Sequence, residues 1–341
     1  GVAAQESKQP DLLRSVPAPI GAGGISASQA HNVELVGQIG GSVYAVAREG
    51  NYAYIGVGPR LVILNVSNPA HPIVAAQTDV LTGIVHGIAL AGNYAYVSTV
   101  FGGLYIIDVS NPATPVETSF HPTFKPYDLT VSGNYAYIAD SEAGLTIINI
   151  ADPANPAQVS SCDTPGFAYD VAVAGNYAYI ADNGGGLRII NIADPAYPFE
   201  ATSYNTPGTA YGVAVAGNYA YVADTSGLYI INIFDPTHPT EEGFYATPGW
   251  AHNVAVAGDY AYVADSDAGL YIINVSDPAN PAEAGSCDTP GTTWDVTVAG
   301  NYAYVADAER GLRIISIADP AHSSEVSFHA TLGDAQEVVV A

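Results

Sequence analysis

Aromatic and acidic side chains recur at fixed positions in this sequence, and both kinds of side chain bind ligands. The positions are counted from the glycine of the string Gly-Asn-Tyr-Ala-Tyr, or once Gly-Asp-Tyr-Ala-Tyr, which begins at Gly50, Gly92, Gly133, Gly175, Gly217, Gly258 and Gly300. Six residues before each glycine, an aromatic column contains Tyr44, His86, Tyr127, Tyr169, Tyr211, His252 and Trp294. The next residue is acidic in three units, as Asp128, Asp170 and Asp295. Aromatic faces bind sugars and cations, and carboxylates bind hydroxyls and cations. The two columns predict a rim for a glycan, a cation or an amine-bearing partner.

A third column lies seven residues after each glycine and contains Val57, Thr99, Asp140, Asp182, Asp224, Asp265 and Asp307. Counting outward from the Gly-Asn turn places Tyr169 opposite Asp182 and Trp294 opposite Asp307. Aromatic and His donors could then satisfy Asp acceptors across a hairpin. This structural pairing and the ligand rim are two interpretations of the same residues, and the sequence leaves both open.

Part of the third column resembles a fragment of a calcium-binding loop. The segments are Asp140-Ser-Glu-Ala-Gly144, Asp265-Ser-Asp-Ala-Gly269 and Asp307-Ala-Glu-Arg-Gly311. None has the full series of ligands with a terminal Glu, and Asp is a common turn residue. We therefore expect no cofactor, with calcium as a weak alternative at Asp140, Asp265, Asp267 and Asp307.

The elements that position these columns are short strands. The strings repeat every 41 or 42 residues. In one unit, the segments 170–174, 177–181, 187–192 and 200–204 have strand patterns, and a Gly-Asn link joins the first two as a hairpin. Four short strands in each unit of about 42 residues predict an all-β fold, a β-propeller of four-stranded antiparallel blades. A parallel β-helix is the competitor, but its coils do not need a hairpin in every unit.

Seven complete units leave two strand-like segments at the ends of the chain. Residues 33–39 align with the fourth strand of a unit, and residues 336–341 align with the first. Either a seven-bladed ring closes by using 33–39 in its last blade, or an eighth blade is incomplete or shared with another molecule. We favour seven blades. The predicted domains are an N-terminal arm or leader, 1–31, and a propeller, 32–341.

The third strands have a recognisable pattern. They read Leu61-Val-Ile-Leu-Asn65, Leu104-Tyr-Ile-Ile-Asp108 and Leu145-Thr-Ile-Ile-Asn149, and each is followed by Asn/Asp-Pro-x-x-Pro. This pattern resembles the LVIVD-repeat family. The resemblance implies a propeller of a bacterial or archaeal surface or secreted protein, so we expect an extracellular or cell-surface location. It implies no particular activity.

The composition excludes several classes of function. The chain has 33 acidic and 8 basic residues in 341, a formal net charge of −25. Nucleic-acid binding needs a basic face, and no apolar run approaches the roughly 18 residues of a membrane span. There is no Gly-x-Ser-x-Gly elbow, His-Glu-x-x-His motif or phosphate loop. We expect a protein that is not an enzyme, with an unrecognised catalytic site as an alternative.

The ends of the chain suggest self-assembly. Residues 1–31 are rich in Gly, Ala, Ser, Pro and Gln and form either a flexible leader or an arm that docks on a neighbour. Surplus strands also leave an unpaired edge, which can pair with another chain. The candidate assembly residues are Leu12, Leu13, Val16, Ile20, Val338 and Val340. The predicted function is a non-catalytic structural or adhesive module that binds itself or another surface protein. Glycan or cation binding by the rim is the alternative.

Two further patterns carry less information. Cys162 and Cys287 occupy the same position three units apart, whereas a disulfide needs Cα atoms within about 7 Å. An internal bridge is therefore not expected, and either buried thiols or intersubunit bridging remain. The segments 65–67 and 274–276 match the N-glycosylation pattern, which makes Asn65 and Asn274 weak candidates for modification.

Overall fold

The computed structural model describes residues 43–330. The predicted arm, the two surplus strands and the domain boundary at residue 31 lie outside this range. So do the candidate assembly residues Leu12, Leu13, Val16, Ile20, Val338 and Val340. Within the described range, no helix is long and apolar enough to cross a membrane.

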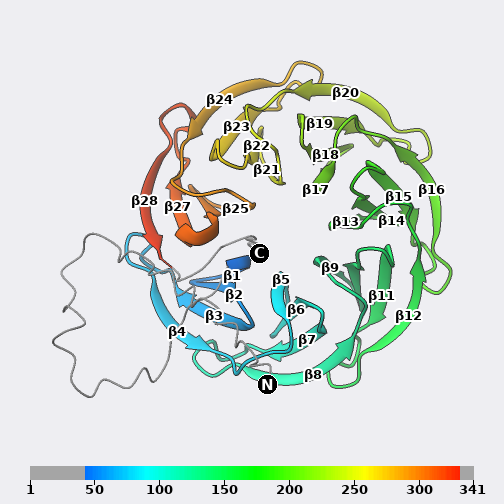
Figure 1. Ribbon diagram of the computed structural model, residues 1–341, viewed down its shortest axis with the longest axis vertical. Helices are drawn as coiled ribbons and strands as arrows, with labels where there is room; N and C mark the ends of the chain where they lie inside the picture. The colour runs from blue at the N-terminus through cyan, green and yellow to red at the C-terminus, as the bar shows by residue number, and fades with distance from the viewer. Residues whose placement is uncertain (1–42, 331–341) are drawn as a thin grey trace, which may run out of the picture. The chain divides into compact units, whose positions relative to one another are not determined.

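The described chain forms seven sheets, each built from four consecutive antiparallel strands, and the sheets are arranged around a centre as blades (Figure 1). Blade 1 contains β1 (Val43–Glu49), β2 (Tyr52–Val57), β3 (Arg60–Asn65) and β4 (Ile73–Gln77). Blade 2 contains β5 (Ile84–Ala91), β6 (Tyr94–Val100), β7 (Gly103–Asp108) and β8 (Val116–Pro122). Blade 3 contains β9 (Asp128–Ser132), β10 (Tyr135–Ala139), β11 (Leu145–Asn149) and β12 (Ala157–Cys162).

The other four blades repeat this order. Blade 4 contains β13 (Asp170–Ala174), β14 (Tyr177–Ala181), β15 (Leu187–Asn191) and β16 (Phe199–Tyr204). Blade 5 contains β17 (Ala210–Ala216), β18 (Tyr219–Asp224), β19 (Gly227–Asn232) and β20 (Thr240–Tyr245). Blade 6 contains β21 (Asn253–Ala257), β22 (Tyr260–Ala264), β23 (Leu270–Asn274) and β24 (Ala282–Cys287). Blade 7 contains β25 (Asp295–Ala299), β26 (Tyr302–Ala306), the 3₁₀ turn η2 (Ala308–Arg310), β27 (Leu312–Ser316), the 3₁₀ turn η3 (Pro320–His322) and β28 (Ser324–His329).

The first strand of each blade lies nearest the centre and the fourth lies at the outer edge (Figure 1). The hydrophobic core lies between neighbouring blades. One cluster, for example, joins Tyr179 and Ile189 of blade 4 to Val213 and Ile231 of blade 5. The second and third strands are therefore buried on both faces, which explains why strings such as Leu-Arg-Ile-Ile and Tyr-Ala-Tyr-Ile are nearly continuous apolar runs.

The ring closes between blades 7 and 1 in the same way as elsewhere. Val46 and Ile55 pack against Tyr304 and Ile314 in one cluster. Ser327 Oγ also donates to the Pro69 carbonyl at 2.5 Å. Its repeat equivalents link blades 2 to 3 and 3 to 4, through Ser119 to Pro153 and Ser160 to Pro195. The prediction of a seven-bladed propeller is confirmed.

The fourth strand of the last blade is β28, from that blade's own unit, which pairs with β27. The predicted role of residues 33–39 in closing the ring lies outside the described residues. Cys162 and Cys287 are both free, half-buried thiols at the ends of β12 and β24.

Candidate functional site

Each innermost strand begins with a β-bulge, in which two residues face one residue of the second strand. In blade 3, the Tyr127 amide donates to the Ala139 carbonyl at 2.9 Å, and Asp128 is also paired with Ala139. The same arrangement recurs in blades 4, 6 and 7, and the register shifts at the equivalent point in β1, β5 and β17. Consecutive residues of a regular strand point to opposite faces, and a bulge redirects one of them. The aromatic residue and the residue after it can therefore line the same space.

The bulge corrects the pairing that was counted from the Gly-Asn turn. Tyr169 and Trp294 share their partners with the next residue, so they lie opposite Ala181 and Ala306. They are not opposite Asp182 and Asp307 as predicted. The extra residue of the bulge shifts the count by one.

The aromatic column forms a continuous arc of rings. Neighbouring ring centroids are 5.4 Å apart from His86 to Tyr127 and 4.9 Å apart from Tyr127 to Tyr169. The arc continues through Tyr211 at 5.2 Å, His252 at 4.9 Å and Trp294 at 4.0 Å. The side chain of Tyr44 lies outside the described part. Six of the seven predicted aromatic residues are therefore in contact along one arc.

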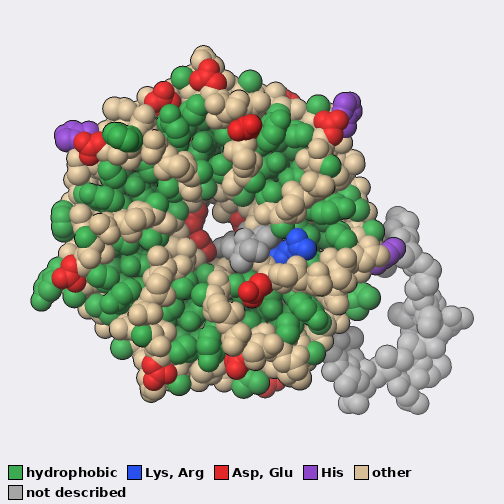
Figure 2. Space-filling view, turned by 180° about the vertical axis from the view of Figure 1, so that it is seen from behind, with side chains coloured by type: hydrophobic (Ala, Val, Ile, Leu, Met, Phe, Trp, Pro, Cys, Tyr) green, Lys and Arg blue, Asp and Glu red, His purple; other side chains and the backbone are tan. Residues whose placement is uncertain are grey.

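These rings surround a cavity of about 470 Å³, here called the channel-mouth pocket. It is lined by Ile84, His86, Val100, Phe101, Lys125, Tyr127, Asp128, Tyr169, Asp170, Tyr211, His252, Asn253, Trp294 and Asp295. The structure thus brings together the predicted aromatic and acidic columns. In the space-filling view from behind, acidic side chains are visible in the wall of the central opening (Figure 2).

Asp128, Asp170 and Asp295, here called the inner carboxylates, line this pocket. Asp170 and Asp295 are buried, and Asp128 is partly buried. Asp170 accepts from the amides of Val171 at 2.6 Å and Val213 at 2.7 Å. Asp295 accepts from the Val296 amide at 2.7 Å. Its Oδ2 atom, like Oδ1 of Asp128, is buried with no hydrogen-bond partner in the described residues.

Burial is the main cause that raises the pKa of Asp170 well above its ordinary range, and Asp128 raises it further by repulsion and a side-chain hydrogen bond. Burial likewise raises the pKa of Asp295, and the charges of Asp128 and Asp170 add to the effect. A proton or a bound cation therefore stabilises this group of acids.

The two histidines of the arc are neutral at pH 7. Burial and the Lys125 charge lower the pKa of His86 to about 3. Burial lowers the pKa of His252 to about 4. The Nδ1 atom of His252 is buried without a hydrogen-bond partner in the described residues. Both rings can offer a hydrogen bond or a stacking face, but they add no positive charge to the pocket.

A second set of buried acids surrounds the first and has a structural role. These outer carboxylates, Asp140, Asp182, Asp224, Asp265 and Asp307, are at most 2% exposed. Each accepts a backbone amide hydrogen from the loop that enters its own blade. Thr164, Thr247 and Thr289 also donate their hydroxyls to Asp182, Asp265 and Asp307, at 2.6, 2.5 and 2.7 Å.

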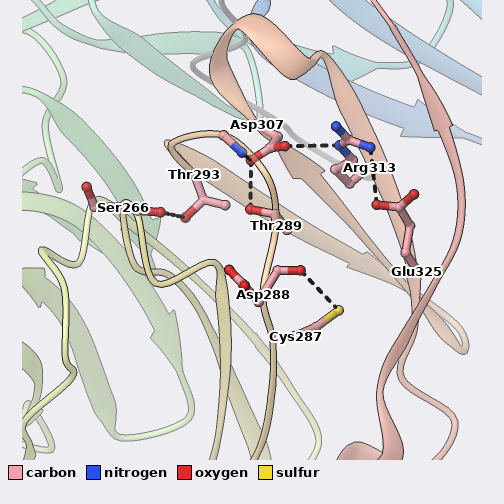
Figure 3. A network of polar contacts seen from close by, with 9 residues as sticks. Ser266, Cys287, Asp288, Thr289, Thr293, Asp307, Arg313 and Glu325 are labelled. Atoms are coloured by element: carbon pink, nitrogen blue, oxygen red, sulfur yellow. Dashed lines mark hydrogen bonds and ion pairs between the residues drawn. The ribbon is translucent and has the colours of Figure 1, made fainter. Parts of the chain in front are cut away.

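In blade 7, Asp307 also receives Arg313 at 3.0 Å, and Arg313 in turn contacts Glu325 (Figure 3). Asp267, the remaining calcium candidate, accepts from the Thr292 hydroxyl at 2.8 Å. Within residues 43–330, no three His, Cys, Asp or Glu side chains converge to hold a metal. The outer carboxylates hold loops, because their oxygens already face protein donors. The sequence carried a signal for this role, since Thr and Asp are 18 residues apart in units 4 to 7.

Five residues that line the channel-mouth pocket were not among the predicted site residues: Ile84, Val100, Phe101, Lys125 and Asn253. The first four come from blade 2 and the loop after it, where the sequence departs from the repeat. The glycosylation candidates lie elsewhere, at the ends of β3 and β23. The side-chain oxygens of Asn65 and Asn274 accept from the amides of Ser67 at 2.9 Å and Ser276 at 3.0 Å. Four other blades have the same turn, so these contacts are part of the repeated fold.

Comparison with known proteins agrees with this architecture. The model of the LVIVD repeat matches seven consecutive segments, 40–80, 82–122, 125–164, 165–206, 207–247, 248–289 and 290–331. The chain belongs to the LVIVD-repeat family. No curated protein matches it significantly.

Solved structures show the same fold at low identity. A functionally unknown protein from Desulfotomaculum acetoxidans is 15% identical with a TM-score of 0.70, and the match covers 84% of this chain and 98% of that one. The β-propeller domain of Myceliophteria thermophila Cps50 (Swd1) is 14% identical with a TM-score of 0.65, covering 80% and 95%. Sqt1 of Saccharomyces cerevisiae is 8% identical with a TM-score of 0.67, covering 85% and 86%. These similarities support the fold alone.

Proposed function

We propose that this LVIVD-repeat propeller is a non-catalytic binding module whose channel-mouth pocket takes a small organic cation. One observation carries the proposal: three carboxylates share the pocket with a continuous arc of aromatic rings, and Asp128 and Asp295 each have a buried oxygen without a hydrogen-bond partner in the described residues. Carboxylates and aromatic faces are the two protein groups that attract an ammonium ion most directly.

The electrostatic need for a cation comes from the inner carboxylates. Burying an ionised carboxylate is unfavourable unless an opposite charge or hydrogen bonds compensate it. In the described residues, the ion pairs of Arg188 and Arg313 go to outer carboxylates and to Glu200 and Glu325. No ion pair in that part of the chain involves an inner carboxylate. A cationic ligand would supply the missing charge.

The dimensions favour an organic cation over a bare metal ion. Asp128 and Asp170 come from the neighbouring blades 3 and 4, whereas Asp295 comes from blade 7, and within the described residues no three His, Cys, Asp or Glu side chains converge to hold a metal ion. The cavity of about 470 Å³ falls within the range of roughly 300–1,000 Å³ that is usual for small-molecule sites. Its aromatic wall can cover the apolar part of a ligand while the carboxylates bind the ammonium group.

The test uses Trp294 as an internal reporter. The chain has two tryptophans, and Trp250 is 61% exposed outside the pocket. A Trp250→Phe protein therefore reports on Trp294 alone. Phenethylamine and its neutral analogue 2-phenylethanol are titrated at pH 7. We expect the amine to give a saturable change in Trp294 fluorescence and the alcohol to bind at least tenfold more weakly.

Charge-matched variants make the test specific. Asp295→Asn and Asp170→Asn should each weaken phenethylamine binding by about tenfold, the loss of one charged contact. Asp259→Asn removes the same charge from an exposed turn and restores the Gly-Asn of the other six units, so it should bind as the parent protein does. Equal binding of the alcohol and the amine, or unchanged binding by both pocket variants, would exclude the cation proposal. A neutral sugar that bound independently of these acids would favour the glycan alternative.

Self-assembly and a surface location remain sequence-based proposals. Self-assembly rests on residues 1–31 and 336–341, which lie outside the described range. Electron microscopy of the full chain and of a variant lacking residues 1–31 tests it. Polymers that disappear on truncation would support assembly through the arm, whereas monomers of both proteins under all conditions would oppose it.

A further inference from the structure

Lys125 is the one positively charged residue among the described residues that line the channel-mouth pocket. It is the only lysine in the described residues, and it lies in the loop that connects β8 to β9. No carboxylate forms an ion pair with it in that part of the chain. In a protein with a net charge of −25, a lysine without such a partner is unusual, and this one lines the pocket.

Two aromatic rings hold the Lys125 ammonium group at the pocket. Its Nζ atom is 5.1 Å from the centroid of the Tyr127 ring and 5.7 Å from that of Phe101. The loop itself is fixed from below, because the amides of Phe124 and Lys125 donate to the buried Asp140 at 3.2 and 2.6 Å. The positive charge is therefore held in place by backbone anchors and aromatic contacts.

The contact between Lys125 and Phe101 arises where both residues depart from the repeat. Four other entry loops contain Thr-Pro-Gly, whereas this loop reads Thr123-Phe124-Lys125. Phe101 has a left-handed φ of 66° and is 76% exposed. Turns of the same length in other blades have Glu142, Gly184, Asp267 and Glu309 at this place.

A bulky residue such as Phe101 is strained in the left-handed region. Because its ring is largely exposed, hydrophobic burial does not offset this strain. Neither Lys125 nor Phe101 helps blade packing or the hairpin, and the two side chains contact each other through the Lys125 ammonium group. Both changes are therefore explained by what they do at the pocket.

We propose that the ligand of the channel-mouth pocket is a zwitterion of the amino-acid type. Its ammonium group binds the inner carboxylates and its carboxylate binds Lys125. This inference rests on the proposed cation binding and extends it. The pocket carries negative charge along the start of the innermost strands and one positive charge on a loop, so it complements a ligand with two opposite charges. The arc of aromatic rings covers the apolar part between them.

The experiment compares L-phenylalanine with phenethylamine, which lacks only the carboxylate. Both are titrated against the Trp250→Phe protein at pH 7, with Trp294 fluorescence as the readout. A charged hydrogen bond to Lys125 should make L-phenylalanine bind at least tenfold more tightly than phenethylamine. In Lys125→Gln this preference should fall to less than threefold, and phenethylamine should bind slightly more tightly because a like charge has been removed.

Arg310→Gln is the matched control. Arg310 is an exposed base in η2 and is not among the residues that line the pocket, so this variant should retain the tenfold preference. Absence of a preference in the parent protein, or the same preference in Lys125→Gln, would overturn the inference. Failure of phenethylamine itself to bind would overturn the proposed cation site. The two failures are thus distinct, and the melting temperature of each variant shows whether it is folded.

Discussion

The outer and inner carboxylates are two sets of acids at the same end of the propeller, and they differ in their partners. Every outer carboxylate accepts an amide hydrogen from its entry loop, and four accept a threonine hydroxyl as well. The inner carboxylates Asp128 and Asp295 each have a buried oxygen without a hydrogen-bond partner in the described residues. Burial alone therefore does not identify a functional acid in this protein. The donors around it do.

The outer and inner carboxylates also differ in how regularly they occur in the repeat. Five blades have an outer carboxylate, and its hydrogen bonds are similar in each. The inner position is Asp in three blades and Ala45, Gly87, Gly212 or Asn253 in the others, yet all seven blades form the same bulge. The fold therefore does not require an acid at the inner position, and the inner carboxylates need another explanation.

The largest effect should come from removing an outer carboxylate that has no arginine partner. Asp265→Ala leaves the Thr247 hydroxyl and the Gly249 amide without their acceptor. An unsatisfied donor costs about 1–3 kcal/mol, so we expect the unfolding free energy to fall by about 3 kcal/mol and the melting temperature by roughly 4–5 °C in a domain of this size. Calorimetry against the exposed control Asp259→Asn measures this. A fall below about 1 kcal/mol would mean that the loop contacts are not structural.

The strands and the aromatic arc could be predicted because they repeat. The predicted segments 170–174 and 177–181 coincide with β13 and β14, and one spacing places all aromatic residues on equivalent strands. The bulge could not be read from spacing, because two residues share one partner without changing the length of the unit. Lys125 and Phe101 escaped a search for recurring positions because they depart from the repeat. The structure adds the information that only hydrogen-bond register and neighbouring blades provide.

The next effect concerns acid stability and the uncompensated His252. Its pKa is about 4 in the folded protein and about 6.5 in an unfolded chain. A lowered folded pKa gives stability that is complete above pH 6.5 and is lost as pH falls toward 4, by at most about 1.4 kcal/mol per pH unit. Urea unfolding at pH 7.0, 5.5 and 4.5 should show a smaller loss in His252→Gln than in the parent protein. If the unfolding free energies of the parent protein and His252→Gln fell equally with pH, this would contradict the burial of a neutral His252 imidazole.

A smaller effect of opposite sign should come from the inner carboxylates. Because the folded pKa of Asp295 is raised, its stability contribution is complete at low pH and is lost as pH rises through the folded pKa. Asp295→Asn removes this penalty, so the variant should be more stable than the parent at pH 8, with no gain at pH 4. Burial also raises the pKa of Asp265, although hydrogen bonds from Thr247 and Gly249 oppose the shift, so Asp265→Asn should gain less stability at pH 8 than Asp295→Asn. Equal responses of the two variants in urea unfolding would remove the distinction between the two sets.

The smallest effect should come from the arginine that accompanies only some outer carboxylates. Arg188 lies 3.4 Å from Asp182 and 3.4 Å from Glu200, whereas Asp265 has loop donors and no arginine. Blades with and without the ion pair form the same loop, so the threonine and glycine donors are sufficient for it. Arg188→Leu should therefore lower the unfolding free energy by only about 1 kcal/mol, because the largely buried contact with Asp182 is long and Thr164 and Gly166 still donate to this carboxylate. The part contributed by the partly exposed Glu200 should shrink in 1 M salt. A loss as large as that of Asp265→Ala would show that charge compensation, and not the loop hydrogen bonds, makes the outer acids tolerable.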